Sequence, residues 1–242
     1  MIPLIPMKTY LRSVALSVLG VLATSGLGAA VESVKIVPTL MPQFSPVLLD
    51  MGITEGKVAL VVDISAEGKL TDWLVLGYTD PQMVRTCVEA LMDWDIKPAR
   101  IDGQAVPAQV ELTIAITAEG VVISRSGPQV FDDTFRRITG NPIKYKLSPA
   151  PALDRVPVAI NAVAPKYAQE AAKQGVTGKV EVHFYIDEKG AVRMPAVKAG
   201  AHPYLAEVAV SAVREWKFEP PTSKGNPVLI AASQEFNFNG GK

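Results

Sequence analysis

The feature of this sequence that most constrains its fold is an internal repeat. When the sequence is aligned with itself at an offset of 122 residues, residues 178–220 fall on residues 56–98 without a gap. The identical residues, some lying just beyond this stretch, are at the earlier positions Gly56, Lys57, Val58, Ile64, Gly68, Val75, Pro81, Val88, Ala90, Trp94, Pro98, Gly103 and Val106. A unit that recurs at a fixed offset is a structural unit. The 242-residue chain is therefore predicted to contain two tandem copies of one small module.

The first copy has the pattern of a two-layer α+β module with the order helix, strand, strand, helix, strand. A short apolar run ends near Met51, apolar residues alternate along 57–65 and 106–116, and 70–76 is a second β-prone run. Asp80 and Pro81 provide a helix start. The apolar stripe of that helix consists of Met83, Cys87, Ala90, Leu91 and Trp94. One such stripe has to cover one face of a short antiparallel sheet.

The second copy repeats this order. A short helix is predicted over 165–174, an alternating strand follows from 180 to 186, and Pro203 begins the main helix. Its stripe consists of Leu205, Ala209, Ala212, Val213 and Trp216. Pro195 interrupts the second strand, which predicts an edge position or a bulge there. The last strand is predicted over 228–238.

These patterns define four segments. Residues 1–30 are a predicted signal peptide, 38–118 the first module, 119–151 a connector and 152–239 the second module. The connector is assigned from its density of Gly and Pro, and residues 130–138 are a candidate short helix within it.

The first 30 residues are typical of an export signal. Lys8 and Arg12 precede a short apolar run, and small residues precede Val31. We expect cleavage after Ala30 and a periplasmic mature protein. The alternative is an inner-membrane anchor formed by the uncleaved segment. Both Met1 and Met7 are candidates for the true start.

The composition shows no sign of catalytic, metal or nucleic-acid chemistry. With 24 basic and 24 acidic residues and no long run of either sign, a nucleic-acid partner is not expected. The single cysteine, Cys87, is interpreted as a buried thiol in preference to a nucleophile. His183 and His202 have no partners at metal-ligand spacing. We therefore expect no cofactor, no metal site and no enzymatic activity.

The second copy resembles the C-terminal domain of TonB. The resemblance covers about residues 153–238 and rests on Pro165, Tyr167, Ala171, Gly175, Gly178, Val180, Ile186, Asp187, Gly190, Ala212, Val213, Trp216, Phe218, Pro220, Gly225, Pro227 and Val228. The first copy resembles the same family more loosely, through Gly56, Val58, Gly68, Trp94, Ile96, Pro98, Gly103 and Val106. It is thus predicted to be a divergent copy, since Tyr167 and Asp187 have no counterparts in it.

The resemblance implies a non-enzymatic periplasmic protein that takes part in TonB-type transport across the outer membrane. Its partners would be outer-membrane TonB-dependent receptors or other extended peptides, which add a strand to an exposed sheet edge. Carried over by position, the binding strand would contain Val228, Ile230, Ala232, Gln234, Phe236 and Phe238. The alternative is a structural or assembly protein that self-associates through sheet edges, for example as a homodimer.

The sequence also departs from a full energy transducer of this family. Such proteins keep an uncleaved N-terminal helix with a polar coupling residue, followed by a long Pro-rich spacer. Here the apolar segment has no His or acidic residue, and only about a dozen residues separate it from the first module. At ~3.5 Å per extended residue, this segment would span tens of ångströms. Coupling to an energy source is therefore not implied.

Overall fold

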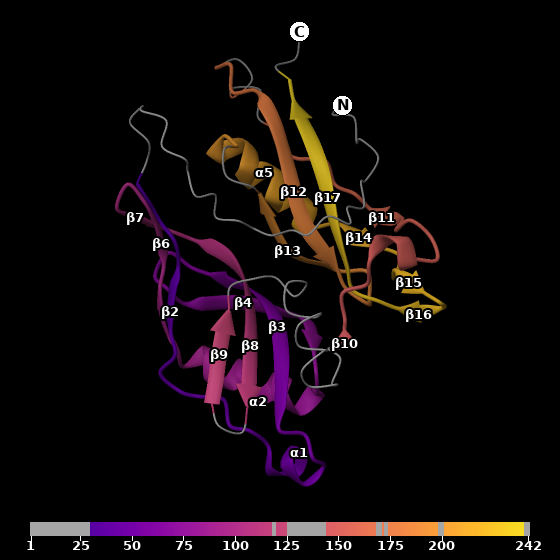
Figure 1. Cartoon of the computed structure of the whole chain (residues 1–242). Helices are drawn as coiled ribbons and strands as arrows, with labels where there is room; N and C mark the ends of the chain where they lie inside the picture. The colour runs from indigo at the N-terminus through magenta and orange to yellow at the C-terminus, as the bar shows by residue number, and fades with distance from the viewer. Residues whose placement is uncertain are drawn as a thin grey trace. The chain divides into compact units, whose positions relative to one another are not determined.

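The computed structural model describes residues 30–117, 120–124, 144–167, 171, 174–197 and 201–239. The chain divides into two compact units, with the boundary between Lys146 and Leu147. Unit 1 denotes the described residues up to Lys146, and unit 2 those from Leu147 (Figure 1). Residues 1–29 of the predicted signal peptide, the candidate helix over 130–138 and half of the predicted helix over 165–174 lie outside the described residues.

Unit 1 is built on a five-stranded antiparallel sheet with the order β10-β4-β3-β8-β9. These strands are β3 (Glu55–Ile64), β4 (Leu70–Tyr78), β8 (Ala108–Thr117), β9 (Gly120–Ser124) and β10 (Lys144–Tyr145). Two smaller sheets, β1-β6-β7 and β2-β5, lie in the same unit. Their strands are β1 (Val31–Glu32), β2 (Lys35–Val37), β5 (Asp95–Lys97), β6 (Ala99–Ile101) and β7 (Gln104–Val106).

Two helices complete unit 1. They are α1 (Pro46–Asp50) and α2 (Pro81–Met92). Helix α2 begins at the predicted position, where the Asp80 carboxylate accepts a hydrogen bond from the Gln82 N–H at 2.8 Å. Its predicted stripe packs into the same buried cluster as the apolar residues of β3 and β8. The stripe and the alternation together therefore form the core of unit 1.

Unit 2 is built on a three-stranded antiparallel sheet with the order β13-β12-β17. Its main elements are β12 (Gly178–Ile186), β13 (Val192–Val197), α5 (Pro203–Arg214) and β17 (Ile230–Phe238). The smaller ones are η1 (Ala150–Ala152), β11 (Ala159–Asn161), β14 (Lys217–Phe218), β15 (Thr222–Ser223) and β16 (Asn226–Pro227). Helix α5 packs on β12 and β13, and its predicted stripe is buried (Figure 1).

The mixture of helices and small antiparallel sheets confirms the predicted α+β class. The main elements also share one offset, because α2 and α5 begin at Pro81 and Pro203, and β8 and β17 at Ala108 and Ile230. Each interval is 122 residues, which is also the offset of the sequence identities. That the two units are tandem copies of one family stays a prediction.

Pro195 lies in the strand position that the sequence predicts. Strand β13 is the edge of its sheet, and its register with β12 shifts between His183 and Tyr185. A proline cannot donate to the sheet ladder, so an edge strand with an irregular register accommodates it.

The predicted last strands are shorter than expected. Instead of running continuously from 106 and 228, each is preceded by a small hairpin, β6–β7 or β15–β16. The residues at the tips have positive φ, with 50° at Asp102, 78° at Gly103, 51° at Lys224 and 76° at Gly225. Two successive positive values are the signature of a tight two-residue hairpin turn.

Two described stretches of the predicted connector form strands. Residues 120–124 form β9 beside β8, and Lys144–Tyr145 form β10 beside β4. Both strands belong to the sheet of unit 1. The density of Gly and Pro in this stretch carried no information about these two strands.

Candidate functional site

Strand β17 is an outer strand of the unit 2 sheet. One of its edges pairs with β12 along its whole length, from Phe238 opposite Gly178 to Ile230 opposite Ile186. Among the described residues, no strand pairs with the other edge. Just before β17, Leu229 forms an isolated bridge with Leu147. We call the second edge, along Ile230–Phe238, the open edge of β17.

The direction of the main-chain groups along the open edge follows from Leu229. Its carbonyl accepts a hydrogen bond from the Ser148 N–H at 2.7 Å and therefore points away from β12. In an antiparallel strand, the main-chain groups of alternate residues point to the same side. The residues that direct their N–H and C=O groups to the open edge are thus Ala231, Ser233, Glu235 and Asn237.

The six residues that the sequence proposes for binding occupy the other set of positions. Val228 precedes β17 and is half-buried, whereas the remaining five side chains lie in the core of unit 2. Phe236 lies against Trp216, with ring centroids 5.8 Å apart, and Phe238 against Tyr167 at 5.3 Å. These five side chains anchor β17 to the core of unit 2. Because they are buried, they are not available for side-chain contact with a ligand. Whether the strand binds a partner stays a prediction.

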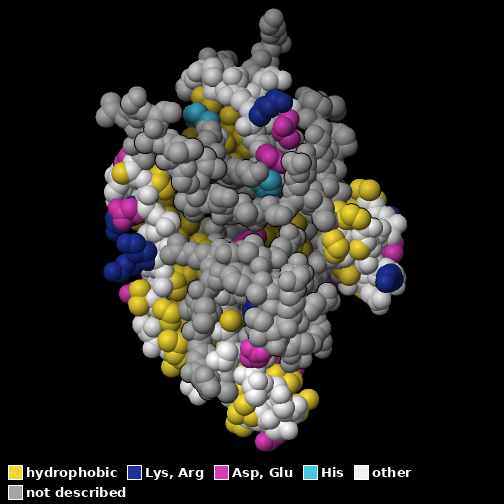
Figure 2. Space-filling model, viewed as in Figure 1, with side chains coloured by type: hydrophobic (Ala, Val, Ile, Leu, Met, Phe, Trp, Pro, Cys, Tyr) yellow, Lys and Arg dark blue, Asp and Glu magenta, His cyan; other side chains and the backbone are white. Residues whose placement is uncertain are grey.

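The face of the sheet opposite α5 is polar along β12 and β17. Figure 2 shows acidic, basic and histidine side chains gathered in the upper part of the view, over these strands. Glu181 and Glu235 lie directly opposite one another. Two like charges in this position repel unless other groups compensate them. The polar contacts of this face supply that compensation.

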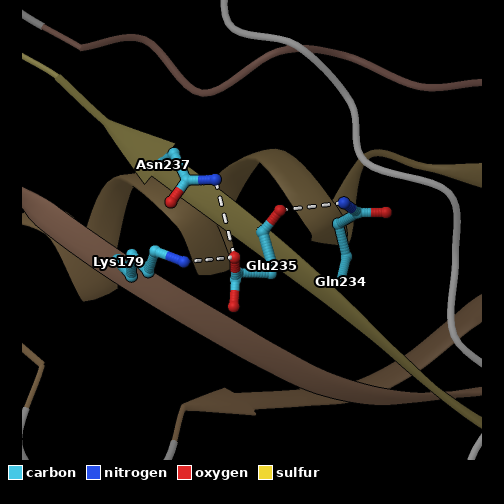
Figure 3. A network of polar contacts seen from close by, with 4 residues as sticks. All are labelled: Lys179, Gln234, Glu235 and Asn237. Atoms are coloured by element: carbon cyan, nitrogen blue, oxygen red, sulfur yellow. Dashed lines mark hydrogen bonds and ion pairs between the residues drawn. The ribbon is translucent and has the colours of Figure 1, made fainter.

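Glu235 is compensated by a residue of β12 and by its own strand. Its Oε1 lies 3.2 Å from Lys179 Nζ and accepts a 3.5 Å hydrogen bond from Asn237 Nδ2 (Figure 3). The Lys179 and Glu235 side chains are 71% and 41% exposed, so this ion pair contributes at most about 1 kcal/mol. It orients two side chains beside the open edge more than it stabilises the fold.

Glu181 is compensated by a hydrogen bond from Ser233, and His183 lies beside it. Its Oε1 accepts a 3.0 Å hydrogen bond from Ser233 Oγ, and its Oε2 lies 3.4 Å from His183 Nε2. The Ser233 hydroxyl thus donates to the Glu181 carboxylate and links β17 to β12 across the sheet.

Gln234 is the unusual member of the buried set. It is 4% exposed, and its Nε2 donates a 2.9 Å hydrogen bond to the Glu235 carbonyl (Figure 3). That carbonyl belongs to the open edge. The buried Gln234 side chain therefore donates a hydrogen bond to a main-chain carbonyl at the open edge. At the corresponding position 122 residues earlier, unit 1 has the buried Leu112.

Cys87 is buried in α2, as predicted. Desolvation by burial raises the pKa of its thiol to about 12, so it is protonated at neutral pH. Within the part of the chain that the structure describes, no three His, Cys, Asp or Glu side chains are grouped as metal ligands. The described helices likewise include none with the length and apolarity needed to cross a membrane.

Comparison with known proteins concerns unit 2. Residues 163–239 match the family model of the Gram-negative bacterial TonB protein C-terminal. No curated protein matches the chain. The match contains β12, β13, α5 and β17, and it supports the resemblance found in the sequence for this stretch. It does not extend to unit 1.

Proposed function

We propose that this chain is a non-enzymatic, TonB-like periplasmic protein that binds an extended segment of an outer-membrane receptor along the open edge of β17. The family match supports a role in outer-membrane transport at the coarse level. The observation that carries the finer proposal is the open edge of β17, because it lies inside the matched residues.

The chemistry of this edge suits strand addition. An incoming extended segment gains affinity from main-chain hydrogen bonds and specificity from its alternate side chains. Ala231, Ser233, Glu235 and Asn237 offer main-chain partners, while the buried Phe236 and Phe238 hold the strand in place. The partner's side chains on the polar face would lie beside Glu235 and Asn237, which favours small, polar or basic residues there.

A periplasmic location belongs to this proposal and has its own test. Cleavage after Ala30 would remove a residue whose N–H donates to Asp102 Oδ1 at 2.9 Å and whose carbonyl accepts from the Asp102 N–H at 2.9 Å. We expect N-terminal sequencing of the protein isolated from cells to begin at Val31. A chain that begins near Met1 or Met7 would instead support the inner-membrane anchor.

The binding proposal is tested by titrating the isotope-labelled chain with a synthetic TonB-box peptide of an outer-membrane receptor. We expect amide chemical shifts to change at Ala231, Ser233, Glu235 and Asn237. Glu235→Pro should abolish binding, because it removes a donor at the open edge without removing a bond to β12. Glu235→Ala is the matched control, since it keeps the N–H and should bind within about threefold of the unmodified chain.

Two outcomes would contradict the proposal. One is a titration that leaves the shifts of residues 231–237 unchanged. The other is equal binding by Glu235→Pro and Glu235→Ala. The same edge is also the observation that favours self-association, because a second copy could pair with it. Sedimentation decides between these functions: a monomer at high concentration that binds the peptide excludes a scaffold built by pairing of β17.

A further inference from the structure

In unit 1, the edge that corresponds to the open edge of β17 is already occupied. Strand β9 pairs antiparallel with β8, from Gly120 opposite Thr117 to Ser124 opposite Thr113 (Figure 1). The occupant comes from the same chain, and only two residues separate the two strands in the sequence. Strand β9 is therefore an example, within the same chain, of a strand paired with the outer edge of the last long strand of a unit.

The correspondence between the two edges holds residue by residue. Strand β8 pairs with β3 so that Ile116 lies opposite Gly56, and β17 pairs with β12 so that Phe238 lies opposite Gly178. Both partners in the second pair lie 122 residues after those in the first. Hence Thr113 and Ala115 occupy in β8 the positions that Glu235 and Asn237 occupy in β17.

The direction of the main-chain groups agrees with this correspondence. Thr117 and Gly120 are paired across a connection of two residues, and the pair that closes such a hairpin exchanges main-chain hydrogen bonds. Alternate pairs do the same, namely Ala115 with Val122 and Thr113 with Ser124. Ala115 and Thr113 thus direct their N–H and C=O groups to β9, as Asn237 and Glu235 direct theirs to the open edge.

A side-chain difference between the units supports the same reading. In unit 2, Gln234 Nε2 donates to the Glu235 carbonyl at the open edge. In unit 1, the corresponding carbonyl is that of Thr113, which faces Ser124 of β9. The residue before it is Leu112, which has no polar group to donate. The edge with its own strand needs no side-chain donor, and the open edge has one.

We propose that β9 is an intramolecular ligand that occupies the strand-docking edge of unit 1 and prevents this unit from pairing with external strands. Its residues Val121, Val122 and Ile123 are strong strand formers, as an extended ligand requires. The closed edge assigns strand recognition to unit 2. The inference concerns residues 113–124 and is measured there, so it can fail while binding at residues 231–237 succeeds, and the reverse.

Two proline variants of the full chain test this inference. Val122→Pro removes the N–H that β9 directs to β8, whereas Val121→Pro removes one that points away from β8, which an edge strand tolerates. The probe is a synthetic peptide with the sequence of residues 119–125. We expect it to shift the amide signals of residues 113–117 in Val122→Pro but not in Val121→Pro or the unmodified chain. A peptide with proline at the position of Val122 should bind about tenfold more weakly.

Hydrogen exchange of the unmodified chain provides a test that does not depend on the folding of any variant. The amides of Thr113 and Ala115 should exchange on the order of a hundredfold more slowly than those of Glu235 and Asn237. Similar exchange at the two edges would overturn the inference. So would peptide binding to residues 113–117 of the unmodified chain, or a folded Val122→Pro variant that does not bind the peptide.

Discussion

At the scale of single residues, two glycines illustrate how closely the backbone segments approach. Gly68 and Gly190 have φ values of 79° and 81°, in the left-handed region. A Cβ atom on either would meet a main-chain carbonyl oxygen, that of Ile96 or of Phe218. Both glycines therefore allow a hairpin turn to lie directly against the strand that follows the main helix. No other residue type fits there without movement of the backbone.

We expect Gly190→Ala to lower the free energy of unfolding of unit 2 by more than about 2 kcal/mol, because steric overlap adds to the left-handed strain. Gly225→Ala is the matched control. Gly225 has a φ of 76°, but a Cβ atom added to it would meet nothing within 4 Å. Its substitution should cost only about 1 kcal/mol. Equal losses in urea denaturation would show that the contact with Phe218 is unimportant.

Asp154 is the residue whose titration should be visible in stability. Its carboxylate accepts hydrogen bonds from the N–H groups of Gly225 at 2.9 Å and Lys224 at 2.7 Å. The hydrogen bond from Gly225, followed by those from Thr222 and Lys224, lowers the pKa of this carboxyl below its ordinary value. The side chain thereby ties the segment before β11 to the tip of the β15–β16 hairpin.

Because the pKa of Asp154 is lower in the folded state, its contribution to stability is complete above the unfolded pKa of about 3.9. It is lost as the pH falls through the lower folded value. We expect Asp154→Ala to have a lower melting temperature than the unmodified chain at pH 7. The difference should vanish at a pH below the folded pKa. A difference that is the same at every pH would mean that the carboxylate charge plays no part.

At the scale of elements, the two main helices begin in different ways. Helices α2 and α5 both have proline in the first turn, and both end without a glycine stop. The Asp80 side chain accepts from the Gln82 N–H, whereas His202 makes no side-chain cap to α5. The start of α5 thus depends on its proline and on packing of the helix against the sheet.

This difference predicts opposite results for two substitutions. Asp80→Ala should destabilise unit 1 by about 1 kcal/mol, because the hydrogen bond to Gln82 is lost. His202→Asp should stabilise unit 2 by about 0.5–1 kcal/mol, since an aspartate can cap the free N–H groups and interacts well with the helix dipole. Denaturant titration of both variants measures the two changes. A loss of stability in His202→Asp would contradict this account of α5.

At the scale of the whole molecule, each unit has a core of its own, and the two units differ in the strands that pair with the edges of their main sheets. The core of unit 1 is mainly aliphatic, whereas unit 2 adds Phe184, Trp216, Phe218, Phe236 and Phe238. Both edges of the main unit 1 sheet carry short strands, β9 and β10. The main sheet of unit 2 has three strands in the described residues. The two units therefore differ in which sheet edge is paired among the described residues.

Because the cores are separate, a cavity made in one unit should lower the stability of that unit and leave the other unchanged. Phe184 is 1% exposed and lies against Trp216 and Phe218. Phe184→Ala should lower the stability of unit 2 by about 3–5 kcal/mol. Hydrogen exchange read residue by residue should show faster exchange in β12 and β17. The amides of β3 and β8 are the internal control, and equal acceleration there would contradict separate cores.

Local periodicity was sufficient to predict most of the fold from the sequence. The alternation along 180–186 and the helical stripes after Pro81 and Pro203 identified the buried faces, which β12, α2 and α5 confirm. The alternation along 57–65 predicted only one buried face, whereas β3 is buried on both, with Lys57, Ala59 and Val61 on the second. These patterns are readable because burial repeats every two residues in a strand and about every 3.6 in a helix. The spacing of Gly, Pro and Trp residues in the second half of the chain likewise predicted its resemblance to the TonB C-terminal family.

What pairs with each sheet edge was decided only by the tertiary structure. Every residue except proline carries the same N–H and C=O groups, so the sequence of β17 cannot show that its outer edge is open. For the same reason, the residues chosen from alternation were the buried ones, and those that face the open edge were missed. Residues 120–124 read as part of a connector, yet they close the matching edge of unit 1. The repeat in the sequence predicted two modules; the pairing of main-chain groups decided which sheet edges are paired among the described residues.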